Sequence, residues 1–487
     1  MALDTATAQV RQEKKPQKAW WALNFLALAQ LMVVLDGTIV NLALPRLQTE
    51  MGISDSTRSW VVTAYALAFG AFLLLGGRIA DFWGRKRTFI VAAVGFAAAS
   101  FVGGIAQESW ELIGARALQG VFAALLAPAA LALLTVAFPA GKDRGTAFAI
   151  FGSISGVGAA IGVLLGGYLT DYASWRWCFF VNIPIAVIAF LGVWLTVRES
   201  KAEGSTKYDW PGVVLAALGL GSLVYGFTNA EHGWGAPEAW GFILAGVVLL
   251  ALFVLVEKNV KHPLLPLRVA TERNRAAAFL ASFLSGAVLI GGILFINYYV
   301  QIVLGFAPFP AGIASLPMTV VLIATAAVVA KNLPKLGAKI PTAVGPVFMA
   351  ASMLWLTQVS AEGSYAVNML PALILMGMGL GMVFVPMQNL ALFGVDKDDS
   401  GVASALVNAS QQIGGSLGIA LFSTIAAAFT AAAGGASMAA LTAGYSAVFL
   451  WAAAVAILII PIAVVLIRID RTTFSGADAD AAPVHLG

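Results

Sequence analysis

Charged residues are scarce in this chain. Only 11% of its 487 residues are Asp, Glu, Lys or Arg, whereas 60% are apolar. A soluble domain carries about 25% charged residues, and a single soluble core stops growing at about 250–300 residues. So few charges cannot cover a water-facing surface, and we therefore expect the lipid bilayer to be the solvent.

Cysteine and histidine are nearly absent as well. Cys178 is the single cysteine, which excludes a disulfide framework within the chain and a cluster of thiolate ligands. The histidines His232, His262 and His485 all fall in polar segments. We therefore expect no metal and no cofactor. The apolar segments also lack a catalytic His–Glu or Asp–Asp set, which disfavours an intramembrane acyltransferase or protease.

Long apolar runs take up most of the sequence. A spanning helix needs about 20 apolar residues, and a run that long near the N-terminus indicates a retained helix rather than a signal peptide. The fourteen runs lie at approximately 20–44, 58–79, 88–106, 110–138, 145–170, 178–197, 211–228, 239–257, 276–301, 311–330, 341–359, 366–391, 401–430 and 443–467.

The positions of Lys and Arg test this count. With the N-terminus inside, the outer loops hold only Arg46, Arg58 and Arg176, Arg116 lies within a span, and the other 24 of the 28 are cytoplasmic. Such a bias orients membrane proteins, so we expect an even number of spans and two cytoplasmic termini. The positive residues are distributed among the cytoplasmic loops and are not gathered on one face of the protein. The net charge of +4 therefore does not indicate a nucleic-acid partner.

The longest charged segments between spans are Arg198–Asp209 and Glu257–Arg275. They bracket the seventh and eighth spans, and GRIADFWGRKR at 77–87 is faintly repeated as KNLPKLGAKIP at 331–341. Transporters are commonly built from such repeats, with the substrate near the midplane. We expect an all-α membrane protein with a tail at 1–19, six helices at 20–200, a helix pair at 201–262, six helices at 263–470 and a tail at 471–487.

Asp36 is the acid that lies deep in a span. A charge at the bilayer centre costs at least about 2.5–3.5 kcal/mol, so such a residue is a functional candidate. At 1.5 Å of rise per residue, Asp36 and Arg116 lie at similar depths, and we expect a direct or water-bridged pair. Burial favours the protonated acid and the guanidinium favours the carboxylate, so small helix movements could load or release a proton. A purely structural carboxylate, or an arginine anchored on backbone carbonyls, remains an alternative.

Other polar residues and glycines within spans are candidates for a cavity or for packing. Polar side chains in spans usually bond to neighbouring helices, and small residues four apart allow close helix contact, so packing is the alternative for each. The candidate cavity residues are Asn41, Gln119, Asn297, Tyr298, Gln301, Gln388, Asn389, Ser404, Asn408 and Gln411, and the glycines of the fifth span are Gly158, Gly162, Gly166 and Gly167.

Several segments together resemble the major facilitator superfamily and its fourteen-helix drug:proton antiporter branch. The likeness runs from about residue 20 to 470. It is carried by LDGTIVNLALP (35–45), GRIADFWGRKR (77–87), LIGARALQGVFAA (112–124), GVGAAIGVLLGGYL (156–169), WRWCFFVNIPI (175–185) and GVASALVNASQQIGGSLG (401–418).

The resemblance implies two six-helix bundles that rock around a central cavity. It assigns proton coupling to Asp36 and Arg116, an antiporter motif to the glycines of the fifth span, and a cytoplasmic latch to Gly77, Asp81, Gly84, Arg85 and Lys86. The chain departs from the family pattern at Phe82, where a second basic residue is usual, at Val163, where proline is usual, and at Gln411, where arginine is frequent.

We therefore expect a proton-coupled exporter of amphipathic, neutral or monocationic small molecules, because a single deep carboxylate argues against dications. The expected setting is the bacterial cytoplasmic membrane, and the expected state is a monomer. A proton symporter or a uniporter on the same fold, and a receptor without flux, remain alternatives.

Overall fold

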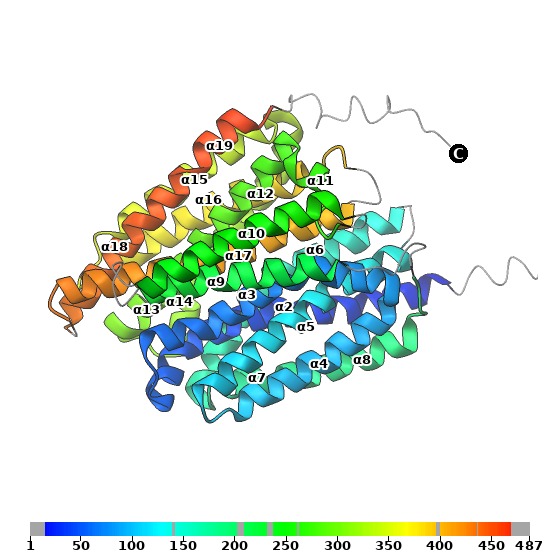
Figure 1. Ribbon diagram of the computed structural model, residues 1–487. Coiled ribbons are helices and arrows are strands. Elements are labelled where there is room, and N and C mark those ends of the chain that lie inside the picture. The colour runs from blue at the N-terminus through cyan, green and yellow to red at the C-terminus, as the bar shows by residue number, and fades with distance from the viewer. Residues whose placement is uncertain are drawn as a thin grey trace, which may run out of the picture.

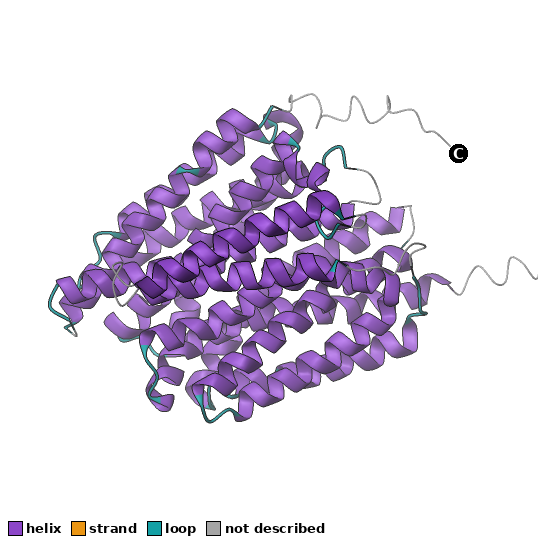
Figure 2. Ribbon diagram, viewed as in Figure 1, coloured by secondary structure: helices purple, strands orange, loops and turns teal. Residues whose placement is uncertain are grey.

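The computed structural model describes residues 15–138, 142–201, 209–230, 237–260, 263–395, 400–435 and 437–468. Within these residues the regular structure is helical, with no β-strand (Figure 2). Thirteen helical stretches are long and apolar enough to span a bilayer, and the apolar helix at Val157–Tyr172 is shorter. The expected all-α membrane fold with about fourteen spanning helices is therefore confirmed.

The first group of helices packs into one bundle, coloured blue to teal in Figure 1. Helix α2 contacts α5, α6 and α8, while α5 also packs on α3 and α4. Their bounds are α2 (Lys15–Met51), α3 (Asp55–Trp83), α4 (Arg85–Ile105), α5 (Ser109–Ala137), α6 (Lys142–Tyr172), α7 (Trp177–Phe180) and α8 (Asn182–Thr196), with α7 and α8 forming one span.

A second bundle follows later in the chain. It contains the ninth and twelfth of the fourteen spans expected for the chain, and both have π-helical turns, in which the backbone widens locally. Its elements are α12 (Arg273–Gly286), η2 (Ala287–Gly291), α13 (Gly292–Tyr298), η3 (Tyr299–Val303), α14 (Pro308–Leu336), α15 (Lys339–Leu356), η4 (Tyr365–Met369), α16 (Leu370–Leu392), α17 (Ser400–Ala432), α18 (Met438–Ile457) and α19 (Ile459–Leu466).

Two helices, α9 (Trp210–Asn229) and α10 (Pro237–Asn259), form an antiparallel pair in front of the bundles in Figure 1. Helix α9 packs against both α3 and α17, so the pair contacts both bundles. A short helix, α11 (Leu267–Thr271), then leads into α12. We propose that these three groups correspond to the units expected at 20–200, 201–262 and 263–470.

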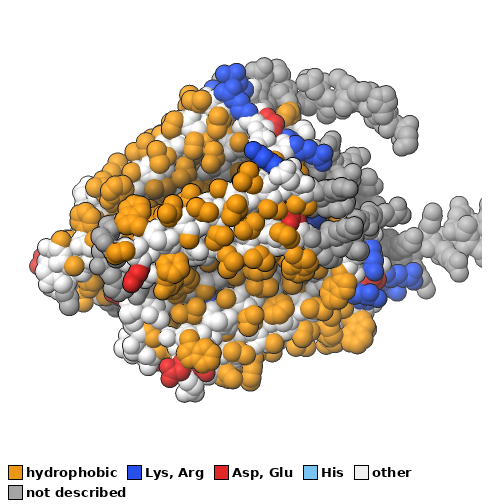
Figure 3. Space-filling model, viewed as in Figure 1, with side chains coloured by type: hydrophobic (Ala, Val, Ile, Leu, Met, Phe, Trp, Pro, Cys, Tyr) orange, Lys and Arg blue, Asp and Glu red, His pale blue; other side chains and the backbone are white. Residues whose placement is uncertain are grey.

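The surface is divided into an apolar middle and a basic end. On the face in Figure 3, hydrophobic side chains cover the middle, and Lys and Arg side chains gather towards the end at which α2 begins. We call this the basic end; Arg85, Lys86 and Arg87 lie there, at the start of α4. Helix α2 finishes and α3 starts at the other end, which we call the opposite end.

The bundles are in close contact at the opposite end. The hydroxyl oxygens of Ser59 in α3 and Ser423 in α17 are 3.0 Å apart. The guanidinium of Arg58 lies 3.7 Å from the ring centroid of Tyr298 in α13. These contacts join the first bundle to the second, so the structure is closed at this end.

Candidate functional site

Asp36 lies in the core of the first bundle with none of its side chain exposed. Its Oδ2 accepts a hydrogen bond from Arg116 Nη1 at 2.6 Å. Its Oδ1 accepts from Gln119 Nε2 at 3.0 Å and from Asn182 Nδ2 at 2.8 Å. The carboxylate therefore has one charged donor and two neutral amide donors, each of which stabilises the ionised form.

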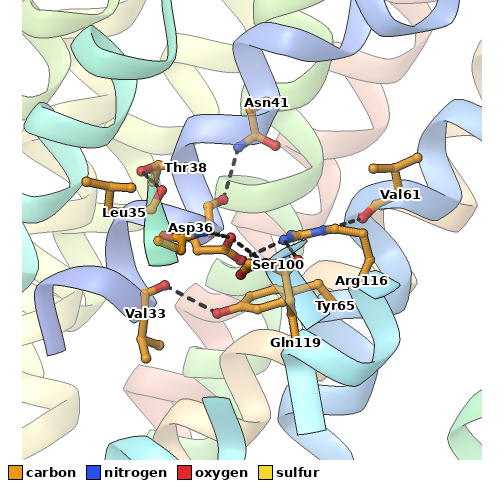
Figure 4. Close-up of polar contacts among 12 residues, drawn as sticks. Val33, Leu35, Asp36, Thr38, Asn41, Val61, Tyr65, Ser100, Arg116 and Gln119 are labelled. Atoms are coloured by element: carbon orange, nitrogen blue, oxygen red, sulfur yellow. Dashed lines mark hydrogen bonds and ion pairs between the residues drawn. The ribbon is translucent and has the colours of Figure 1, made fainter. Parts of the chain in front are cut away.

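Arg116 is held in place by contacts other than Asp36. Its Nε donates to the carbonyl oxygen of Val61 at 2.9 Å, and its Nη1 also donates to Gln119 Oε1 at 2.9 Å. The ring centroid of Tyr65 lies 4.3 Å from the guanidinium carbon (Figure 4). The guanidinium is thus both the counter-charge of Asp36 and an anchor on a backbone carbonyl, the two roles that the sequence left open.

Five spans converge on this carboxylate. Asp36 comes from α2, Tyr65 from α3, Arg116 and Gln119 from α5, and Asn182 from the start of α8. Gln119 also donates to Ser100 Oγ of α4 at 2.7 Å. A shift of α2, α5 or α8 relative to one another changes the donors around Asp36, so the arrangement can link helix movement to the protonation of one acid.

Asn182 is the partner that sequence reasoning missed. It stands inside WRWCFFVNIPI, which carried part of the family resemblance, but no role was assigned to it. A buried amide at the start of an apolar span is the signal that could have found it. Its Oδ1 has no hydrogen-bond donor in the described part of the chain, although the side chain is fully buried.

The glycines of α6 lie against α2, the helix that carries Asp36. A Cβ at Gly162 would lie 2.0 Å from Thr38 Oγ1, and a Cβ at Gly166 would lie 2.4 Å from the carbonyl oxygen of Ile39. Gly167 faces the second bundle instead, where a Cβ would lie 2.6 Å from the carbonyl oxygen of Pro308. Side chains larger than hydrogen would separate these helices.

The expected latch residues lie at the basic end, between α3 and α4. Arg85 Nη2 contacts Asp81 Oδ1 at 3.0 Å within the first bundle. Gly84 joins the two helices with a φ of 130°, a conformation that favours glycine. Gly77 lies earlier, in the last turns of α3.

The carboxylate of Glu199 lies at the first turn of α4, and the sequence does not identify this residue. Its two oxygens accept hydrogen bonds from the backbone amides of Lys86 (3.1 Å) and Arg87 (3.0 Å). The Lys86 ammonium donates to the carbonyl oxygen of Trp194. A helix N-terminus favours an anion, and here Glu199, rather than Asp81, is the acid that supplies it.

The ten expected cavity residues come from several helices. A pocket of about 490 Å³ opens at the opposite end, and of the ten only Gln301 is among its lining residues. Gln119 belongs to the Asp36 network, and Asn41 Nδ2 donates to the carbonyl of Gly37 in its own helix. Tyr298 is fully buried under Arg58, and Asn297 is also buried.

The remaining expected cavity residues lie on α16 and α17. Asn389 and Asn408 are exposed and donate to carbonyl oxygens of their own helices, the latter to Ser404. Gln388 and Gln411 are half-buried. In the described part of the chain, no group of three or more His, Cys, Asp or Glu side chains could hold a metal ion.

The model of the Major Facilitator Superfamily matches residues 26–419. The chain belongs to the major facilitator superfamily. This superfamily member is 44% identical to the puromycin resistance protein pur8 of Streptomyces alboniger over 418 residues, covering 85% of this chain and 83% of the relative. It is 34% identical to the cephamycin export protein CmcT of Amycolatopsis lactamdurans over 416 residues, covering 84% and 86%.

Solved structures show the same superfamily fold. A bacterial homologue of the human lysosomal transporter Spinster, in an inward-facing and unoccupied conformation, matches with a TM-score of 0.65 at 16% identity, covering 95% of this chain and 98% of that one. A POT family transporter matches with a TM-score of 0.64 at 15% identity, covering 91% and 95%. This superfamily member is a transporter and not an enzyme, and its similarity to antibiotic resistance and export proteins supports a drug exporter.

Proposed function

We propose that the protein is a proton-coupled exporter that exchanges protons for amphipathic, neutral or monocationic small molecules. The resistance and export proteins among its relatives support outward drug transport. The observation that carries the proton-coupled part is the fully buried contact of Asp36 with Arg116, in which one acid has both charged and neutral donors. An acid in such surroundings can exchange a proton when its donors move.

The proposed cycle follows from the hydrogen bonds of the carboxylate. When Asp36 is ionised, Arg116, Gln119 and Asn182 all donate to it. Protonation removes the attraction between Asp36 and Arg116 and makes one carboxyl oxygen a donor, so at least one of these contacts must change. Each charge that crosses with the membrane potential supplies about 2.3 kcal/mol per 100 mV, which is enough to bias a two-state movement.

We place the basic end in the cytoplasm, because segments rich in Lys and Arg remain on that side. The setting would be the bacterial cytoplasmic membrane, with both termini cytoplasmic and a monomer as the transporting unit. The contacts at the opposite end then close the outer side, and the Asp81–Arg85 pair, which is formed here within the first bundle, would belong to the cytoplasmic latch.

Everted membrane vesicles test the direction of coupling. An exporter that exchanges substrate for protons will cause proton efflux from acidified everted vesicles when substrate is added, whereas a symporter gives the opposite linkage. Puromycin is a suitable first probe, because a puromycin resistance protein is among the relatives. Asp36→Asn should abolish this signal while the protein remains folded. Unchanged gradient-driven transport by that variant would eliminate the proposal.

A further inference from the structure

Two buried carboxyl groups face each other at the basic end, far along the chain from Asp36. Asp209 precedes the first turn of α9, and Glu257 stands in the last turn of α10. Their relative exposures are 5% and 4%. The side chains of Leu75, Val213 and Leu264 form a small apolar cluster close by.

Each carboxyl group uses one oxygen and leaves the other without a donor. Asp209 Oδ1 accepts from the Gly212 amide at 2.9 Å, and Glu257 Oε2 accepts from the Leu265 amide at 3.0 Å. Among the described residues, the other two oxygens, Asp209 Oδ2 and Glu257 Oε1, have no hydrogen-bond donor. Both point to the same place, because a Cβ on Gly212 would lie 2.3 Å from the first and 2.8 Å from the second.

Among the described residues, the charges near this pair leave room for a proton or a cation. Two neighbouring buried carboxylates cannot both remain ionised, and an unpartnered buried oxygen is costly. The positive charge of Arg78 in α3 acts on Glu257, but the guanidinium donates to the carbonyl oxygen of Pro263 at 2.9 Å. Lys258, the next residue in α10, is exposed.

We propose that Asp209 and Glu257 form a second proton-binding site, in which the two carboxyl groups share one proton through their unpartnered oxygens. One O–H···O hydrogen bond then satisfies both atoms. The site ties the start of α9 to the end of α10, and the contacts of Glu257 with Leu265 and of Arg78 with Pro263 connect it to α3 and to the segment leading into the second bundle. Loss of the proton at high pH would therefore loosen the helix pair at the basic end.

Thermal unfolding of the purified full-length protein at pH 5.5–8.5 tests this site independently of transport. The folded chain holds a proton that an unfolded carboxyl group releases above about pH 4–5. Because the folded state binds more protons, stability must fall as the pH rises towards 8.5. Glu257→Gln supplies a permanent donor to Asp209, so its Tm should depend less on pH and lie about 1–2 °C above wild type at pH 8.5.

Glu238→Gln is the matched control, since Glu238 is exposed on the same helix, and it should follow wild type at every pH. Asp209→Asn keeps an oxygen for the Gly212 amide and should reproduce the weaker pH dependence if Glu257→Gln does not fold. Equal pH slopes for wild type and both variants would overturn the proposal. So would a rise in the wild-type Tm on adding Na⁺ or Ca²⁺ that Glu257→Gln abolishes, because that result assigns the site to a cation.

Discussion

At the scale of single residues, the Asp36–Arg116 pair has two separable properties, stability and proton exchange. Both side chains are fully buried at a contact of 2.6 Å. Breaking a buried ion pair by removing one partner leaves an uncompensated charge, whereas removing both charges is often close to neutral. A double-mutant cycle can therefore separate the two properties.

We predict that Arg116→Gln lowers the stability by about 3 kcal/mol or more, because Asp36 then has no charged partner. The double variant Asp36→Asn/Arg116→Gln should recover much of this loss, since no buried charge remains. Gradient-driven transport should be absent from both. Thermal unfolding and vesicle transport measured on the same preparations check the two parts. A double variant that still accumulates substrate against a gradient would show that the proton is carried elsewhere.

A second prediction concerns Asn182, which donates to Asp36 Oδ1 at 2.8 Å. Replacing it with leucine removes a hydrogen bond to a charged group, which contributes about 1.5–3 kcal/mol. The carboxylate then loses one of its two neutral donors, so gradient-driven transport in vesicles and the Tm should both fall. Asn332→Leu is a control, because that side chain is only half-buried and its amide donates to a carbonyl oxygen of its own helix. Unchanged transport at an unchanged Tm for Asn182→Leu would remove the amide from the coupling network.

The sequence was sufficient to predict the contact between Asp36 and Arg116, but not all of the neutral side chains that bond to them. The constant rise of a helix places two residues at similar depths once the ends of their spans are known. Asn182 and Ser100 reach the network through the tilt and rotation of α8 and α4, which depend on packing and not on span length. The same limit applies to the ten expected cavity residues, which were chosen by polarity alone and remain a prediction.

At the scale of elements, the distance between α2 and α6 is set by glycine. We predict that Gly162→Val lowers both Tm and transport, because a Cβ there would lie 2.0 Å from Thr38 Oγ1 and 3.2 Å from the Cα of Leu35. Overpacking of this kind costs about 1–3 kcal/mol. Gly158→Ala is the matched control, since its Cβ meets only side-chain atoms of Leu31 and Val34 at 3.0 Å or more.

Full transport by Gly162→Val at an unchanged Tm would show that α2 and α6 do not need this close contact.

The missing proline of the family motif bears on the same element. Val163 stands in that position, and its carbonyl oxygen would lie 2.9 Å from a Cβ on Gly312 of α14. Helix α6 thus packs closely against two helices. Its own glycines allow the contact with α2, and Gly312 of α14 allows the contact with α14.

The apolar runs of the sequence predict where these helices lie, but not the local structure at their ends. The apolar runs gave the spans to within several residues, because the bilayer fixes their length. The π-helical turns around Tyr298 and the carboxylate of Glu199 at the start of α4 follow from contacts between distant segments. Neither has a local sequence signal.

At the scale of the whole molecule, the sequence indicated two bundles but not which end is closed. Alternating-access transporters use one sequence for two arrangements, so the difference rests on a few contacts between bundles. At the opposite end those contacts include Arg58 with Tyr298 and Ser59 with Ser423. If the cycle requires this end to open, a covalent bond in place of the hydroxyl contact must stop transport.

We predict that Ser59→Cys/Ser423→Cys forms a disulfide on mild oxidation, because the two hydroxyl oxygens lie 3.0 Å apart. Oxidised protein should lose transport, and a reductant should restore it. The native Cys178 is fully buried. The variants Ser59→Cys alone and Ser423→Cys alone therefore serve as controls and should keep their activity under the same oxidant. Counting free thiols with a maleimide reagent measures the extent of cross-linking. A fully cross-linked protein that transports at the wild-type rate would mean that substrate leaves without separation of α3 from α17.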